Sequence, residues 1–222
     1  WSVDVPAIEE LFTQGKEAPK LLFIASPNNP DGSVIAREDL LRLLELPMVV
    51  VVDQAYVEFG GEDFSRLVPH HANLIVMRTF SKWAGLAGLR VGYGVFPAEI
   101  VGHLFKIKQP YNVNAAAQAA VLASLEDLDI LQARVRTLIA ERELLYTGLQ
   151  AIKALHPYPS HSNFVLNRVL DRDAGELKAA LQRQGILVRY YRTPGLDDHI
   201  RISVGTPEQN VRVLAALRKE LD

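Results

Sequence analysis

Short, almost uninterrupted apolar runs, separated by longer segments, constrain most strongly what this chain can fold into. The runs at 21–25, 48–52 and 74–77 are typical of strands that are covered on both faces of a sheet. Between the first two, residues 36–46 repeat leucine at helical spacing until Pro47. With a further strand predicted at 91–96, this order predicts an α/β fold with a mainly parallel sheet.

The second half of the chain has a different pattern. Residues 114–125 are rich in alanine, and 128–155 form a helical pattern longer than an ordinary globular helix, which indicates a connector between two domains. The later elements are expected as strands at 163–169, 186–191 and 200–204 and helices at 173–184 and 207–221. We therefore expect a large cofactor-binding domain over 1–125, a connecting helix over 126–154 and a small α+β domain over 155–222.

Composition excludes several classes of function. Among 222 residues there is no cysteine, which excludes disulfides, iron–sulfur clusters and thiol catalysis. Lys and Arg number 24 against 26 Asp and Glu, so no bulk charge attracts nucleic acid or an anionic membrane. No apolar run approaches the roughly 20 residues of a membrane helix. We expect a cytoplasmic protein without a metal centre, because His70 and His71 are adjacent and no H-E-x-x-H motif occurs.

Residues capable of chemistry gather where three predicted strands end. The segments are 26–32 (SPNNPDG), 53–56 (DQAY) and 79–94, which holds two hydroxyls, a lysine, several glycines and an arginine. Ligands of open α/β sheets bind beyond the carboxyl ends of the strands. Neither a P-loop nor a G-x-G-x-x-G fingerprint occurs in the third segment. The three ends are therefore expected to form one site that differs from a nucleotide site.

The residue types at these ends match the needs of pyridoxal phosphate. This cofactor needs a lysine for a Schiff base and an acid beside its pyridine nitrogen, which Lys82 and Asp53 supply. Side chains alternate along a strand, so Asp53 and Ala55 share a face while Gln54 points away. The small Ala55 leaves room for a flat ring. Lys82 is also the natural base for a proton shift at the substrate carbon.

Four ordered motifs resemble the class II aminotransferases of fold type I, and within them the histidinol-phosphate aminotransferases. They are SPNNPDG (26–32), DQAY (53–56), RTFSKWAGLAGLRVGY (78–93) and QPYNVN (109–114), and the resemblance runs to the C-terminus. It implies a fold of large and small domains and a homodimer. It also implies amino transfer between histidinol phosphate or imidazole-acetol phosphate and glutamate or 2-oxoglutarate, in histidine biosynthesis.

The resemblance also implies a role for each matching residue. Lys82, Asp53 and Tyr56 are the catalytic residues. Ala55 packs on the ring, and Asn29 and Tyr56 hydrogen-bond the ring 3-oxygen. The cofactor phosphate is expected on Thr79, Ser81 and Arg90. In the small domain, Arg201 resembles the arginine that binds the substrate carboxylate, and Arg189 the one that contacts the substrate phosphate.

Departures from the pattern leave alternatives open. Gln54 stands where the family usually has Glu, and Asp31 where Thr is commoner. Family members begin well before the segment that Trp1 resembles, and this part carries further cofactor contacts, so we expect either a fragment or an incomplete site. The alternative functions are a threonine-phosphate decarboxylase, an aromatic aminotransferase and a truncated chain without catalysis.

Overall fold

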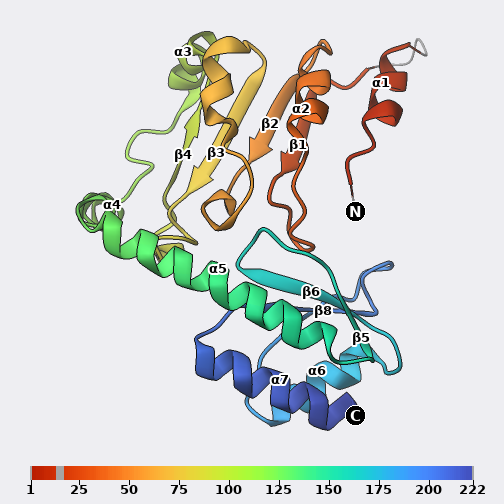
Figure 1. Ribbon diagram of the computed structural model, residues 1–222. Coiled ribbons are helices and arrows are strands. Elements are labelled where there is room, and N and C mark those ends of the chain that lie inside the picture. The colour runs from red at the N-terminus through yellow and green to blue at the C-terminus, as the bar shows by residue number, and fades with distance from the viewer. Residues whose placement is uncertain (1, 14–17, 222) are drawn as a thin grey trace. The chain divides into compact units, whose positions relative to one another are not determined.

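The computed structural model describes residues 2–13 and 18–221 and divides the chain into two compact units (Figure 1). The first unit comprises residues 1–28 and 33–132, and the second comprises 29–32 and 133–222. The second unit therefore includes a short piece of the SPNNPDG turn as well as the C-terminal part of the chain. Each unit has its own sheet and its own hydrophobic core.

A four-stranded sheet in the order β1-β2-β3-β4 forms the centre of the first unit. Its strands are β1 (Leu21–Ala25), β2 (Val49–Asp53), β3 (Leu74–Thr79) and β4 (Gly92–Val95). The first three strands run parallel, and β4 runs antiparallel to β3. The α/β class and the mainly parallel sheet that the sequence predicts are confirmed.

The helices and 3₁₀ turns of this unit are α1 (Val5–Thr13), α2 (Arg37–Leu44), η1 (Val57–Phe59), η2 (Phe64–His70), η3 (Ala87–Leu89), α3 (Ala98–Ile107), α4 (Ala115–Glu126) and the start of α5 (Leu128–Gln150). Apolar side chains of β1, β2 and β3, of α2, and of α1 and η2 form the main core of this unit. Leu40 and Leu43 of α2 are fully buried in one cluster with Val50 and Val52 of β2. Each such side chain stabilises the fold by about 1.5–3 kcal/mol.

One face of β1 departs from the sequence expectation. The prediction that the apolar runs are covered on both faces is wrong for this strand, where Leu21 is 49% and Phe23 65% exposed. Among the described residues, β1 pairs with β2 only, so it forms an edge of the sheet. The neighbouring side chain Ile24 points to the opposite face and is buried in the core.

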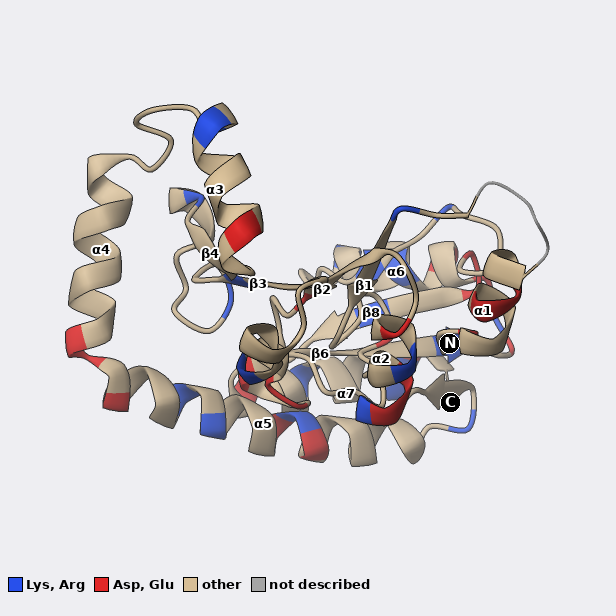
Figure 2. Cartoon of the chain, turned by 90° about the horizontal axis from the view of Figure 1, so that it is seen from above, with Lys and Arg blue, Asp and Glu red and all other residues tan. Residues whose placement is uncertain are grey.

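Helices α3 and α4 also present apolar side chains to solvent. No residue of α3 is buried, and Ala117 is the one buried residue of α4. Phe105 and Ile107 in α3 and Leu122 in α4 are each more than half exposed. Apart from Glu126 at its end, α4 carries no charge, as its uniform colour in Figure 2 shows. No helix within the described ranges is both long and apolar enough to cross a membrane.

The second unit contains an antiparallel sheet in the order β5-β6-β8-β7. Its elements after α5 are β5 (Leu155–Pro157), β6 (Phe164–Val169), α6 (Ala174–Arg183), β7 (Arg189–Tyr190), β8 (His199–Ser203) and α7 (Pro207–Leu221). Leu145 and Leu149 of α5, Leu177 of α6 and Leu217 of α7 are all fully buried in its core. The three helices thus contribute to one apolar cluster with this sheet.

Two element bounds in this unit differ from the prediction. The helix predicted over 128–155 ends at Gln150, because Ile152 and Leu155 turn into the core and Leu155 begins the strand that pairs with β6. The strand predicted over 186–191 is reduced to Arg189–Tyr190. Gly185, with φ of +73°, makes a turn before it; Ile186 and Val188 pack on the core without joining the ladder, whereas Leu187 is exposed.

We predict that Gly92→Ala destabilises the first unit by about 1–3 kcal/mol, because overpacking displaces neighbouring atoms. A Cβ at Gly92 would lie 2.6 Å from the carbonyl oxygen of Arg78 on the paired strand, and backbone cannot swing aside. Urea unfolding measures the effect. Gly88→Ala is the control, because a Cβ there meets no atom within 4 Å. Equal stability of the two variants would contradict the prediction.

Candidate active site

A pocket of about 380 Å³ lies beyond the carboxyl ends of β2 and β3, within the first unit. Parallel pairing places Asp53 beside Met77, so the chain leaves both strands at the same edge of the sheet. The pocket lining combines one carboxylate, one amine, two hydroxyls and two guanidinium-bearing residues with small or apolar neighbours. Its members are Asp53, Ala55, Met77, Arg78, Thr79, Ser81, Lys82, Ala87, Arg90, Val91 and Gly92.

The end of β2 directs its side chains as alternation requires. Asp53 and Ala55 both line the pocket, and the Asp53 carboxylate accepts a hydrogen bond of 2.9 Å from the Ala55 amide. Gln54 is fully buried and is absent from the lining. Its side-chain amide instead donates to the Glu62 carbonyl oxygen at 2.6 Å and accepts from the Phe64 amide at 3.3 Å. The expectation that Gln54 points away from this face is confirmed.

A tight turn after β3 holds the two hydroxyls. The Ser81 amide donates to the Thr79 hydroxyl oxygen at 3.0 Å, and the two hydroxyl oxygens are 2.8 Å apart. The turn is closed by the Phe80 amide, which donates to the Val91 carbonyl oxygen at 3.2 Å. Phe80 is buried in a small apolar cluster that anchors the segment. The hydroxyls and the following Lys82 are therefore carried on one rigid turn.

Arg90 has a backbone conformation that is costly for a residue with a side chain. Its φ of +55° lies in the left-handed region, where non-glycine residues lose roughly 1–2 kcal/mol. Its Nη1 donates to the Ala87 carbonyl oxygen at 2.9 Å, and the exposed side chain lines the pocket. Strain of this kind is concentrated at functional sites. The loop therefore holds a permanent positive charge at the pocket against a backbone preference.

Tyr56 lies close to the pocket without lining it. The side chain is 9% exposed, and the Lys82 ammonium stands 5.4 Å from the centre of its ring. This distance permits a cation–π attraction between the two side chains. Of the residues predicted for the cofactor, six line the pocket and Tyr56 is next to Lys82. The eighth, Asn29, belongs to the second unit.

In the second unit, two arginines occupy directly opposed positions. Arg189 of β7 pairs in register with Arg201 of β8, although like charges opposite each other destabilise a sheet. The Arg201 guanidinium lies 4.5 Å from the centre of the Phe164 ring and donates from Nη1 to Asn29 Oδ1. Its Nε is buried without a hydrogen-bond partner among the described residues. An anion bound beside both guanidinium groups would reduce the repulsion between Arg189 and Arg201.

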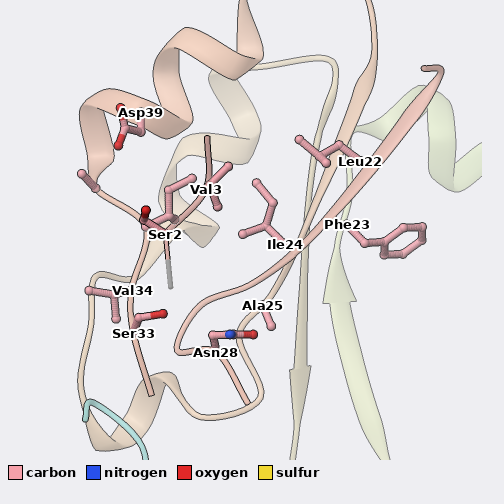
Figure 3. A pocket seen from close by; sticks show the side chains of 12 residues that line it. Ser2, Val3, Leu22, Phe23, Ile24, Ala25, Asn28, Ser33, Val34 and Asp39 are labelled. Atoms are coloured by element: carbon pink, nitrogen blue, oxygen red, sulfur yellow. The ribbon is translucent and has the colours of Figure 1, made fainter. Parts of the chain in front are cut away.

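A second hollow of the first unit offers little chemistry. It measures about 430 Å³ and includes Asp39 as its one ionisable residue; none of the predicted site residues lines it. Figure 3 shows Leu22 and Ile24 projecting from β1 on the side of Val3, while Phe23 projects from the other face. Within residues 2–13 and 18–221, no group of three or more His, Asp or Glu side chains is placed to hold a metal ion.

Sequence reasoning assigned no role to several residues that surround these positions. Arg78 and Gln54 hydrogen-bond each other at 3.2 Å on the far side of the strand ends. Phe164 lies under the Arg201 guanidinium. The Arg189 guanidinium carbon lies 5.3 Å from the centre of the Tyr191 ring. The sequence could have indicated a buried ionic role for Arg78, because this arginine stands within a mostly apolar strand. No local pattern indicates the contact of Phe164 with Arg201, which joins two strands, whereas Arg189 and Tyr191 are two residues apart, a spacing that strand alternation places on one face.

Comparison with known proteins shows the family of this chain. The sequence profile of the family described as "Aminotransferase class I and II" matches residues 1–217. The chain belongs to this aminotransferase family. Over 222 residues it is 48% identical to the histidinol-phosphate aminotransferase of Roseiflexus castenholzii, covering 99% of this chain and 59% of the relative. The chain thus spans well under two thirds of the length of that aminotransferase.

Solved aminotransferase structures share the fold. The histidinol-phosphate aminotransferase of Clostridium acetobutylicum superposes with a TM-score of 0.90 at 25% identity, over 99% of this chain and 68% of that one. The Sinorhizobium meliloti enzyme, solved in complex with pyridoxal phosphate, gives 0.82 at 29%, over 96% and 61%. An L-threonine-O-3-phosphate decarboxylase from Porphyromonas gingivalis gives 0.83 at 28%, over 96% and 68%. The aminotransferase fold is therefore shared by enzymes with different reactions.

We predict that Arg90→Gly is at least as stable as the unchanged chain, whereas Arg90→Ala is less stable than Arg90→Gly by about 1 kcal/mol. Both variants lose the side-chain bond to Ala87, so their difference isolates the backbone conformation. Thermal unfolding of the two variants measures it. An alanine variant as stable as the glycine variant would contradict a strained loop.

Proposed function

We propose that this chain is the part of a pyridoxal-phosphate-dependent aminotransferase that carries the reactive lysine. The activity we propose for the whole protein is transfer of an amino group between histidinol phosphate and 2-oxoglutarate, in histidine biosynthesis. The observation that carries the proposal is a single pocket lined by Asp53, Lys82, Thr79, Ser81 and Arg90. The chain's similarity to histidinol-phosphate aminotransferases supports the choice of substrate.

The donor set of the pocket fits the cofactor chemically. Pyridoxal phosphate supplies an aldehyde that condenses with amines and a ring that withdraws electrons from the bond to be broken. Two hydroxyls and the Arg90 guanidinium suit its phosphate, since arginine binds phosphate through a planar fork. The Asp53 carboxylate would hold a proton on the pyridine nitrogen, because an opposite charge at close range favours the charged form. Ala55 leaves space for the ring.

Lys82 has two roles in this proposal. Its amine would bond to the cofactor in the resting protein and, once a substrate amine replaces it, would move a proton at the substrate Cα. Tyr56, with its ring beside the lysine, is a proposed partner of the ring 3-oxygen. Asn29 is proposed for the same oxygen on the family resemblance alone.

The arginines of the second unit are proposed to bind the substrate's anionic groups. Arg201 would bind the carboxylate of glutamate, and Arg189 the phosphate of histidinol phosphate. The opposed like charges and the unpartnered Nε of Arg201 support an anion at this place. Phe164 supports the Arg201 guanidinium through its ring face.

A threonine-phosphate decarboxylase is the second candidate, because the Porphyromonas gingivalis enzyme has the same fold over most of this chain. An aromatic amino acid could also be the substrate of an aminotransferase. Products separate the three. Carbon dioxide released from threonine phosphate would favour decarboxylation, whereas amino transfer from histidinol phosphate or from an aromatic amino acid would identify one of the transaminases.

We also propose that the whole protein is a cytoplasmic homodimer. Exposed apolar residues on α3 and α4, among them Phe105, Ile107 and Leu122, support a covering partner for these helices. Such residues are unfavourable in water unless another surface covers them.

We predict that borohydride reduction of the chain incubated with pyridoxal phosphate attaches the cofactor to Lys82, because this amine shares a pocket with the phosphate ligands. Mass spectrometry of proteolytic fragments locates the adduct. Lys82→Ala should abolish it, whereas Lys106→Ala, on exposed α3, should leave it unchanged. Absence of an adduct at Lys82 at excess cofactor, or label spread over surface lysines, would contradict the proposal.

We further predict that Arg189→Met weakens binding of histidinol phosphate, and Arg201→Met binding of glutamate, each by about 10- to 150-fold. These factors correspond to a charge-assisted hydrogen bond of about 1.5–3 kcal/mol. Titration calorimetry measures both affinities. Arg192→Met, on the exposed loop after β7, is the control and should change neither. Histidinol phosphate bound equally well by Arg189→Met would remove this arginine from the substrate site.

A further inference from the structure

Behind the pocket, one guanidinium joins three segments of the first unit. Arg78 of β3 donates from Nη1 to Glu58 at 3.3 Å and from Nη2 to Asp63 at 2.5 Å. The same Nη2 also donates to the side-chain oxygen of Gln54 at 3.2 Å. The side chains of Arg78 and Glu58 are 10% and 21% exposed, so their contact is largely shielded from water, whereas Asp63 is 46% exposed. We call these four residues the Arg78 cluster.

Arg78 belongs to the pocket lining, and the other members of the Arg78 cluster lie next to, or close to, pocket residues in the sequence. Arg78 immediately precedes Thr79, and Gln54 immediately follows Asp53. Glu58 lies in η1, whose N-terminal flanking residue is Tyr56. Strand alternation sends the cluster and the pocket side chains in different directions from the same short backbone segments. A shift in the cluster would therefore move the pocket groups with it.

The loop that closes the cluster is itself held in place. Asp63 is the N-cap of η2, accepting from the Ser65 amide at 2.8 Å and the Ser65 hydroxyl at 2.6 Å. Gln54 donates to the Glu62 carbonyl oxygen in the same loop. Burial raises the pKa of Asp63, but the hydrogen bonds from Ser65 and the charge of Arg78 lower it by more, so this pKa lies below its usual value. Asp63 therefore stays ionised and paired with the guanidinium.

The cluster is costly to build, which argues against a role in stability alone. It places two carboxylates around one guanidinium, and burial raises the pKa of Glu58 despite the neighbouring Arg78. Glu58 Oε2 and Arg78 Nε are buried without hydrogen-bond partners among the described residues. Buried ion pairs contribute little net stability compared with apolar residues, while they fix geometry through directional bonds.

We propose that Arg78 is a positioning residue, whose guanidinium fixes the ends of β2 and β3 and thereby the placement of Asp53 relative to Lys82. The Arg78 guanidinium is occupied by Glu58, Gln54 and Asp63 and does not contact cofactor or substrate in this proposal. Arg78 acts instead through the backbone segments that these bonds hold together. The proposal rests on the proposed function of the pocket. It extends that function to residues on the opposite side of the strand ends.

The first test needs no cofactor. Arg78→Met should speed amide hydrogen exchange in two separate segments, 53–59 and 79–82, because both lose their common anchor. Arg37→Met is the matched control, since it removes an exposed ion pair with Glu62 on the same loop without reaching β3. It should leave both segments unchanged. Unchanged exchange in Arg78→Met would overturn the proposal, whether or not the cofactor binds.

The second test measures the cofactor itself in the full chain. Arg78→Met should weaken binding of pyridoxal phosphate by about tenfold or more, since misplacement by 1 Å can cost 100-fold at a reacting site. It should also alter the visible circular dichroism of the bound cofactor, which reports its orientation. Failure of the unchanged chain to form an adduct at Lys82 would refute the proposed function instead, and leaves the exchange test standing.

A double variant separates positioning from stability. Arg78→Met/Glu58→Gln removes the unpaired buried carboxylate and should regain the unfolding midpoint without regaining the affinity or the circular dichroism. Recovery of all three would show that Arg78 only stabilises the fold, and would overturn the proposal. If Arg78→Met does not fold, Arg78→Lys replaces it in both tests, because an ammonium lacks the fork that spans the cluster.

Discussion

The parallel pairing of β2 with β3 is the constraint on which the rest of the first unit depends. Its register sets Asp53 beside Met77, so both strands deliver their next residues to one edge of the sheet. A slip by one residue would turn Asp53 to the opposite face and bring Gln54 to the pocket. The carboxylate and the lysine share a pocket because burial of Val50 and Val52 on the core face of β2 permits a single register.

The two faces of the strand ends have different roles: one lines the pocket, and the other holds the backbone in place. On one face, Asp53, Lys82 and the hydroxyls gather around an open volume. On the other, Gln54 is buried and bonded to the following loop. Most polar groups buried on that face find partners among the described residues, although Glu58 Oε2 and Arg78 Nε do not, and the directional bonds make the segment stiff. Arg90 likewise lines the pocket at the cost of a strained left-handed backbone conformation.

The second unit adds a different kind of chemistry. Its opposed arginines are stacked on aromatic rings, which support a guanidinium without neutralising its charge. The sheet therefore presents positive charge that an anion can match. The match to the aminotransferase family extends over residues of both units. The chain spans only part of the length of its relatives.

The sequence by itself determined the α/β class and the mainly parallel sheet, and it singled out Asp53, Ala55, Thr79, Ser81, Lys82 and Arg90 of the pocket lining, because apolar runs and strand-end motifs are local patterns. It also placed Asp53 and Gln54 on opposite faces, which follows from the two-residue period of a strand. Only the tertiary structure decided where α5 ends, how short β7 is, and that Arg78 and Phe164 lie against other segments. Those outcomes depend on contacts between residues distant in the chain, such as Arg78 with Glu58, and no local pattern records which distant residues will meet.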